Sequence, residues 1–262
     1  MRKIVIAAAV VLAVAGAAPR AEEPKRPWTD TAEFSLVSTS GNTKTTTFSF
    51  GNKYIYAWQK ADLTVNALAL YSDSTKFNDA TNQEETETTA ETYGLDAKYR
   101  RDITDRLLWY GLGSWYQNKP SGIKSRTRGG VGVGYKFVNT DVHKLFGELG
   151  ADYTDETQVG PPEDSASFAG ARGYLGYEGK LSETAKCNLE LEILENLDET
   201  SDYRANFLGS LTASLTSKLA LKASYRVAYD NEPAVGTRGT PPTLYEFDKT
   251  DTIFSVSLVV NF

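Results

Sequence analysis

Hydrophobic and polar residues alternate with period two along most of the chain beyond residue 27. Such alternation places successive side chains on opposite faces of a β-strand. The end of the chain shows it most clearly, where one face carries Phe254, Val256, Leu258, Val260 and Phe262. The preceding segment, residues 219–230, repeats the pattern with lysine, arginine and aspartate on its polar face. One face therefore suits hydrocarbon and the other suits water.

Counted along the whole chain, the alternation predicts about twelve strands, a number common among membrane barrels. They lie near residues 31–39, 44–58, 63–71, 93–100, 106–118, 130–137, 145–153, 168–181, 188–193, 203–215, 219–230 and 254–262. The connections between them alternate in length. Tight turns are expected at 59–60, 104–105, 140–141, 182–184 and 216–217, and the other connections at 40–43, 72–88, 118–124, 155–165, 198–202 and 231–249.

Short turns on one side and longer loops on the other are typical of bacterial outer-membrane barrels, whose even strand number brings both termini to the periplasm. A soluble β-sandwich is the alternative, since its strands also alternate. Two features favour the barrel. The polar face carries opposed charges on many strands, and aromatic residues such as Tyr56, Trp58, Tyr99 and Trp109 fall near strand ends, as interface girdles do. The sequence predicts an all-β transmembrane antiparallel up-and-down β-barrel.

The amino terminus has the form of a secretory signal peptide. Arg2 and Lys3 precede an apolar run over residues 4–18, which is too short to span a membrane as a helix. Cleavage is expected after Ala17, with Ala21 as the alternative. The predicted organisation is a signal peptide at 1–17, a periplasmic lead segment at 18–30 and the barrel at 31–262.

Composition narrows the function classes. The 262 residues carry a formal net charge of -6, which argues against a nucleic-acid surface because phosphate binding needs a clustered positive excess. A single cysteine, Cys187, excludes an intramolecular disulfide and a cysteine-rich zinc site. Aromatic residues make up 11% of the chain, too many for a disordered protein.

Four segments resemble an uncharacterised bacterial family of salt-induced outer-membrane proteins. They are residues 33–43 (EFSLVSTSGNT) together with 45–50, 93–111, 129–141 and 218–233. The resemblance implies an outer-membrane β-barrel, and its name implies envelope maintenance under osmotic stress, but it brings no assigned activity or functional residues. The carboxy-terminal Phe262 also resembles the aromatic residue that the barrel assembly machinery recognises.

The sequence offers few residues suited to catalysis. Barrel enzymes commonly use a histidine base, and the only histidine, His143, follows a predicted tight turn without a partner motif. The sequence has no HExxH and no P-loop, and the glycines at 129–134 fit a strand. The acidic stretch 79–91 lacks ordered calcium-ligand spacing and is interpreted as a solvated loop. We expect no enzyme activity, no cofactor and no metal site.

The inward face is the remaining candidate site. Both signs of charge occur there, and the expected lumen cluster consists of Glu178, Glu190, Glu192, Arg204, Lys222 and Arg226. Strand order places Glu190 and Glu192 opposite Lys222 and Arg226, across Ser210 and Thr212. Such charges could line a narrow pore for small solutes or ions, or pair with one another and close the lumen.

The sequence thus predicts a narrow porin-like channel or an envelope-maintenance protein. A closed-lumen structural or surface-interaction barrel is the alternative, and a barrel enzyme is the least favoured interpretation. The expected partners are outer-membrane lipid and lipopolysaccharide, the barrel assembly machinery and small solutes or ions, with no nucleic acid.

Overall fold

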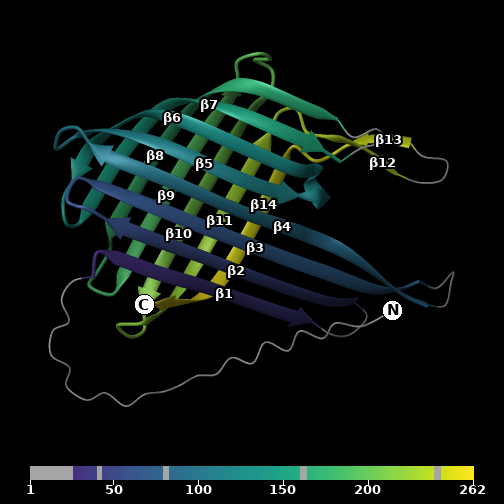
Figure 1. Ribbon diagram of the computed structural model, residues 1–262. Helices are drawn as coiled ribbons and strands as arrows, with labels where there is room; N and C mark the ends of the chain where they lie inside the picture. Colours follow the sequence, from purple (N-terminus) through teal and green to yellow (C-terminus); the bar gives the residue numbers. More distant parts are fainter. Residues whose placement is uncertain (1–25, 40–42, 79–82, 160–163, 239–242) are drawn as a thin grey trace.

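The computed structural model describes residues 26–39, 43–78, 83–159, 164–238 and 243–262. The predicted signal peptide, both cleavage sites and most of the lead segment lie outside these ranges. Twelve strands form one closed antiparallel barrel, in which every strand pairs with its neighbours in the chain and β1 meets β14 (Figure 1). The predicted fold class and strand number are confirmed.

The barrel strands in chain order are β1 (Trp28–Thr39), β2 (Thr43–Ala57), β3 (Ala61–Asn78), β4 (Gln83–Asp102), β5 (Leu107–Asn118), β6 (Ile123–Asn139), β7 (His143–Gln158), β8 (Ser165–Lys180), β9 (Ala185–Asn196), β10 (Tyr203–Ser214), β11 (Leu219–Asp230) and β14 (Thr250–Asn261). A short hairpin of β12 (Val235–Arg238) and β13 (Thr243–Glu246) lies between β11 and β14, and a 3-10 turn, η1 (Lys119–Ser121), joins β5 to β6.

The predicted boundaries differ most from the structure in three places. The expected loop at 72–88 is mostly strand, because β3 and β4 stay paired as far as Asn78 and Gln83. The expected loop at 231–249 contains the β12–β13 hairpin. The barrel also begins at Trp28, inside the predicted lead segment. Beyond the membrane-spanning wall, both faces of a hairpin contact water, so its strands need no alternation of apolar and polar residues. A prediction based on that alternation therefore ends these strands too early.

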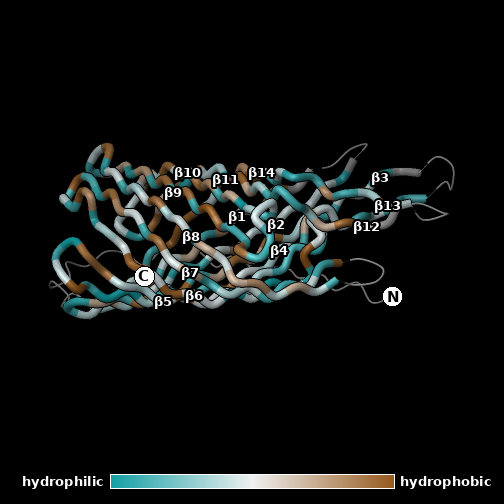
Figure 2. Tube along the Cα trace, turned by 90° about the horizontal axis from the view of Figure 1, so that it is seen from above, coloured by the Kyte–Doolittle hydropathy of each residue, from teal (hydrophilic) through white to brown (hydrophobic). Residues whose placement is uncertain are grey.

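Large apolar side chains cover the outside of the wall. Leu36, Leu149 and Phe254 are 71%, 70% and 70% exposed, and each belongs to the face that alternates with the polar interior. Figure 2 shows the same alternation of hydropathy along the strands. A water-soluble protein rarely exposes so many contiguous apolar side chains, whereas hydrocarbon accepts them. The outer face identifies a transmembrane barrel.

Aromatic rings form a belt where the short turns lie. The ring centroids of Tyr56 and Trp58 are 4.7 Å apart, those of Trp58 and Tyr99 are 6.2 Å apart, and those of Tyr99 and Trp109 are 5.4 Å apart. Such amphipathic rings prefer the boundary between hydrocarbon and headgroups. The belt therefore marks one membrane interface.

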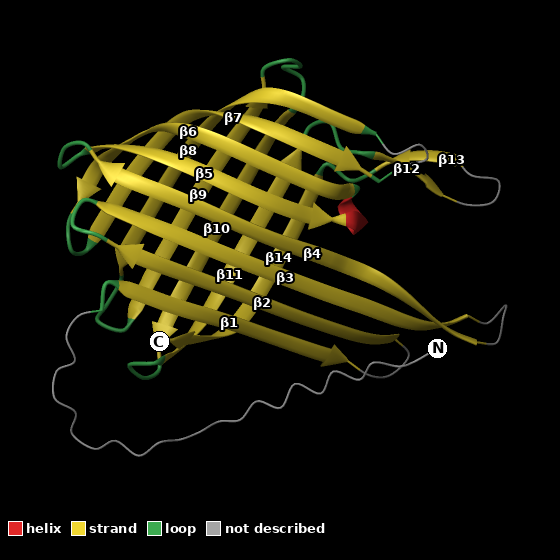
Figure 3. Cartoon of the chain, in the orientation of Figure 1, coloured by secondary structure: helices red, strands yellow, loops and turns green. Residues whose placement is uncertain are grey.

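The tight turns at this end are stabilised by their own threonines. Thr104, Thr140 and Thr216 each accept a hydrogen bond from a backbone amide three residues later, at 2.9, 2.9 and 3.0 Å. Hydroxyl side chains commonly close turns in this way. The predicted turns at 104–105, 140–141 and 216–217 are confirmed, and Figure 3 shows the short connections gathered at one end of the barrel.

Both chain ends of the described barrel lie at this same end. The amide of Phe262 donates to the carbonyl of Asp30 at 3.0 Å, which ties the last residue to the first strand. The cross-section is oval, since the outline is broad in Figure 1 and narrow in Figure 2, with β2–β6 on one broad side and β8–β11 with β14 on the other. In the described ranges no helix is both long and apolar enough to cross a membrane.

Candidate functional site

The lumen is the site where this fold gathers polar chemistry. Period two directs Glu148, Asp152 and Glu156 of β7 inward and Leu149 and Tyr153 outward. The inward set is buried and the outward set is exposed. The same rule applies around the wall, so the functional side chains are positioned by strands rather than by loops.

Glycines on neighbouring strands make room for one large aromatic side chain in the lumen. A Cβ built on Gly132 would lie 2.5 Å from the hydroxyl oxygen of Tyr110, and Gly150 faces the same hydroxyl. Tyr110 is 1% exposed. The absence of a side chain at these two glycines leaves space that the Tyr110 ring fills.

A central ion-pair network crosses several strands beside this ring. The Arg172 guanidinium contacts a Glu148 carboxylate oxygen at 2.8 Å and a Glu192 oxygen at 2.6 Å. Lys98 pairs with the same Glu148, and Arg128 with the same Glu192 at 3.2 Å. The result is a chain of alternating charges, Lys98, Glu148, Arg172, Glu192 and Arg128, which joins β4, β6, β7, β8 and β9.

The middle of the central network, at Glu148 and Arg172, is almost dry. The Glu148 side chain is 0% exposed and that of Arg172 is 5% exposed. Arg172 also donates to the Tyr110 hydroxyl at 3.1 Å. Buried charges are tolerated when each one has a partner, so the network is a fixed filling for this part of the lumen.

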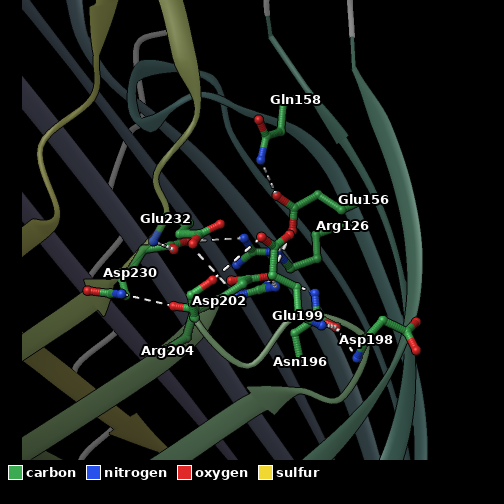
Figure 4. A network of polar contacts seen from close by, with 12 residues as sticks. Arg126, Glu156, Gln158, Asn196, Asp198, Glu199, Asp202, Arg204, Asp230 and Glu232 are labelled. Carbon is green, nitrogen blue, oxygen red and sulfur yellow. Dashed lines mark hydrogen bonds and ion pairs between the residues drawn. The ribbon is translucent and has the colours of Figure 1, made fainter.

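A second cluster lies toward the end with the long hairpins (Figure 4). Arg204 reaches Glu156 at 3.3 Å and Asp202 at 3.4 Å. Arg126 pairs with Glu156 and reaches Asp230 at 3.5 Å. Because Arg126 comes from β6 and Asp230 from β11, this contact spans the narrow dimension of the oval lumen.

An acidic vestibule opens beside the second cluster. It has a volume of about 540 Å³ and lies among β7, β8, the β9–β10 connection and the segment after β11. Arg204 is the one cation in its lining, against the carboxylates of Glu156, Asp164, Glu199, Asp202, Asp230 and Glu232. At the end of the barrel with the long hairpins, the vestibule side of the lumen therefore favours cations electrostatically.

The β5–β6 connection reaches across the lumen next to this vestibule. The Ser121 hydroxyl of η1 donates to Asp251 of β14 at 2.5 Å. Gly122 follows with a φ of 85° and packs against Ala234 and Phe247, and its left-handed conformation suits glycine. The β5–β6 connection thereby contacts β14 on the opposite broad side.

The lumen wall outside the networks carries small hydroxyl side chains. Thr47 and Ser72 are hydrogen-bonded at 2.8 Å on β2 and β3, and Ser224 and Ser255 at 2.8 Å on β11 and β14. Two inward-facing cations here, Lys53 and Arg226, are exposed to solvent, and the described residues give neither an ion pair. Small side chains and two exposed cations leave this half of the lumen less filled than the half with the networks.

The residues of the predicted lumen cluster face inward, but they do not form one cluster. Glu192 joins the central network, Arg204 joins the second cluster and Lys222 pairs with Glu33 of β1 at 2.7 Å. Glu178 lies near the tight turns, 3.8 Å from Lys144, and Glu190 accepts a hydrogen bond from Asn188 at 2.6 Å.

The expected pairing of Glu190 and Glu192 with Lys222 and Arg226 was wrong because the register differs. Ser210 lies between Asn188 and Ser224, and Thr212 between Lys186 and Lys222. Lys222 is therefore level with a lysine, and Arg226 is level with Glu190 across Leu208 without an ion pair between them in the described residues. The predicted lumen cluster also left out Tyr110, Glu156 and Asp230, although two of these are charged residues at inward positions.

Candidate chemistry elsewhere is limited. His143 is exposed at the start of β7, and its Nδ1 lies 2.8 Å from the Tyr177 hydroxyl. Within the ranges that the structure covers, no group of three or more histidine, cysteine, aspartate or glutamate side chains could hold a metal ion. The acidic stretch predicted as a loop is largely in β4, where Glu84 pairs with Lys44 at 2.6 Å.

Comparisons with known proteins give a family and a set of similar barrels. A family model described as "Protein of unknown function, DUF481" matches residues 32–262. No curated protein matches the sequence. Among solved structures, the chain is similar to an outer-membrane channel from Pseudomonas putida F1, with 10% identity, a TM-score of 0.48 and coverage of 92% of this chain and 97% of that one.

Two further structures are similar in the same way. The translocator domain of the autotransporter NalP from Neisseria meningitidis has 12% identity and a TM-score of 0.47, with coverage of 92% of this chain and 90% of that one. The NanC porin has 10% identity and a TM-score of 0.44, with coverage of 89% and 97%.

Proposed function

The chain belongs to the family of proteins of unknown function DUF481, and we propose that it is a narrow porin-like channel of the bacterial outer membrane. Its solutes are small, hydrophilic molecules or ions. The observation that carries the proposal is the asymmetric lumen, which is filled by ion pairs along β4–β9 and lined by small hydroxyl groups along β1–β3, β11 and β14.

The proposed route follows the hydroxyl-lined half. Ser224, Ser255 and Ser35 present short polar side chains there, and the inward Arg226 is exposed. On the other half, the side chains of Arg172 and Glu148 occupy the lumen. A channel with one filled half has a small bore, so the expected conductance is lower than that of an open barrel.

The features that suit the outer membrane support this function. The apolar outer face, the aromatic belt and the even number of strands with short turns at one end are features of outer-membrane barrels. By that pattern, the tight turns face the periplasm and the β12–β13 hairpin faces outward. The signal peptide, recognition of Phe262 by the assembly machinery, contact with lipopolysaccharide and a role in osmotic stress remain predictions.

Single-channel recording in planar bilayers tests the route. The wild-type protein is expected to give small current steps, and Ser224→Trp is expected to remove most of the current because an indole fills the space beside Ser255. The control is Ala223→Trp, which adds the same ring to the lipid-facing side of the same strand and leaves the current unchanged.

If correctly inserted protein carries no current, the proposal that it is a channel is rejected. It would favour a closed-lumen structural barrel, which the dry central network supports as the second candidate. Equal effects of Ser224→Trp and Ala223→Trp would reject the assignment of the route.

A further inference from the structure

The wall has a weak point between its first and last strands. β1 pairs with β14 only over Thr31–Phe34 and Leu258–Asn261 within the described residues, whereas β14 pairs with β11 from Thr250 to Val260. Figure 1 shows β1 and β14 meeting near the carboxyl terminus and diverging toward the other end. The upper part of β1, from Ser35 to Thr39, pairs with β2 alone.

Unpaired strand edges are costly in hydrocarbon, because lipid tails offer no hydrogen bonds to backbone amides and carbonyls. Water or a ligand must reach both edges. The divergence therefore leaves a stretch of the seam without backbone pairing between β1 above Phe34 and β14 above Leu258, and this stretch is called the opening below.

An ion pair marks the lower end of the opening. Lys222 of β11 reaches over β14 to Glu33 of β1, with Nζ and Oε1 2.7 Å apart. Glu33 immediately precedes Phe34, the last residue of β1 that pairs with β14. This contact holds the seam closed below, while nothing comparable joins β1 to β14 above it in the part that the structure describes.

The edges of the opening are apolar. Leu36 on β1 and Phe254 and Val256 on β14 point outward and are 71%, 70% and 54% exposed. Val37, which faces the lumen, is 53% exposed. An apolar side chain that is exposed toward the lumen is unusual beside the hydroxyl-lined wall, and it gives an alkyl chain a surface on both sides of the opening.

A cation, Arg226, lies on the lumen side of the opening. Arg226 of β11 faces the lumen level with Ile253 of β14, and extension of the β1–β14 register would place Thr39 at this height. Glu190 is the acidic residue at the same level, separated from Arg226 by Leu208, and it is already hydrogen-bonded to Asn188. Asp251 of β14, two residues before Ile253, is the other nearby carboxylate, and it accepts a hydrogen bond from Ser121. The described residues give Arg226 no ion pair with either carboxylate, so its guanidinium can bind an anionic group.

We propose that the opening between β1 and β14 is a lateral site for an anionic amphiphile with an acyl chain, such as a fatty acid. The chain lies between the apolar edges formed by Leu36, Val37, Phe254 and Val256, and the carboxylate binds Arg226. This site connects the lumen with the membrane, so it goes beyond axial passage of hydrophilic solutes. It depends on the seam and does not require axial conductance.

Disulfide trapping tests the opening in a Cys187→Ser background. The pair Thr31→Cys and Asn261→Cys lies in the closed part of the seam and is expected to oxidise to a disulfide. The pair Val37→Cys and Ser255→Cys would face each other only if the same register continued upward, and it is expected to stay reduced. Equal disulfide formation in both pairs would overturn the proposal, as would a disulfide between two copies of Val37→Cys alone, which would place a second chain in the seam.

Photolabelling tests the ligand. A palmitate analogue with a diazirine on its alkyl chain is expected to label β1 and β14 selectively in the membrane-inserted protein, and unlabelled palmitate should compete. Arg226→Ala is expected to reduce this labelling at least about tenfold, which corresponds to loss of a hydrogen bond to a charged group. Lys53→Ala is the control, since it removes another exposed inward cation, level with Thr31 below the opening.

The uncharged methyl ester should label wild type and Arg226→Ala equally. Labelling spread evenly around the outer face, or equal losses in Arg226→Ala and Lys53→Ala, would overturn the proposal. Current through the pore is recorded separately, so failure of the channel and failure of the lateral site are distinguishable.

Discussion

Replacement of Arg172 by alanine is expected to lower the free energy of unfolding by about 3–5 kcal/mol, the usual loss when one partner of a buried ion pair is removed. The substitution leaves Glu148 and Glu192 without their shared guanidinium. Glu148 would keep Lys98 as a partner, yet its side chain has no exposed surface from which to recruit water. Denaturant unfolding of the protein in lipid or detergent measures the change.

The matched control is Lys144→Ala. Lys144 pairs with Glu178 at 3.8 Å, and both side chains are more than half exposed, so this loss should stay below about 1 kcal/mol. A double-mutant cycle of Arg172→Ala with Glu148→Gln should show a positive coupling, because the second change removes the carboxylate that the first leaves unpaired. Equal losses for Arg172→Ala and Lys144→Ala would mean that the central network is solvated.

The second large effect concerns the outer face. Leu149→Arg is expected to destabilise the inserted barrel by about 2–4 kcal/mol, the cost of arginine on the lipid face near the bilayer midplane. Leu149 lies between Val133 and Gly173 on neighbouring strands, well away from both ends of β7, and is 70% exposed. The same unfolding assay in lipid measures it.

Leu181→Arg provides the comparison. Leu181 follows β8 at the tight-turn end and is 61% exposed, so its replacement should cost no more than about 1 kcal/mol near the interface. In a water-soluble protein, both exposed leucines would accept arginine with little change. Equal and small effects at the two positions would therefore contradict a lipid-facing wall.

The faces of the strands could be predicted from sequence because they depend on local geometry alone. Period two at Leu149 and Tyr153 against Glu148 and Asp152 holds for any β-strand, whatever its neighbours. The tight turns were equally local, since a threonine such as Thr216 closes its own turn. Strand number and alternation of turn length followed from these two signals.

The partners in the lumen could not be predicted, because they depend on how strands shift past one another around the barrel. Lys222 is level with Lys186 in the observed register and reaches sideways to Glu33, which is distant in sequence. Arg126 and Asp230 meet because the cross-section is oval. Stagger and flattening are properties of the closed wall, and no single strand encodes them.

The hairpin of β12 and β13 was missed for a related reason. Residues 231–249 include prolines and glycines and lack clear apolar alternation, so they suggested an irregular loop. The paired segments, Val235–Arg238 and Thr243–Glu246, are too short to produce a periodic signal. Segments this short gain their order from packing, such as the contact between the Tyr245 and Phe247 rings at 5.0 Å.

The most direct test of a lipid-facing wall around a wet half-lumen is a spin-label scan of β11. Single cysteines at Ala223, Tyr225 and Val227, and at Ser224, Arg226 and Ala228, are placed in a Cys187→Ser background in liposomes. The outward set should be relaxed by oxygen dissolved in the membrane and the inward set by a water-soluble nickel chelate. Access of the chelate to the outward set, or to neither set, would contradict the account.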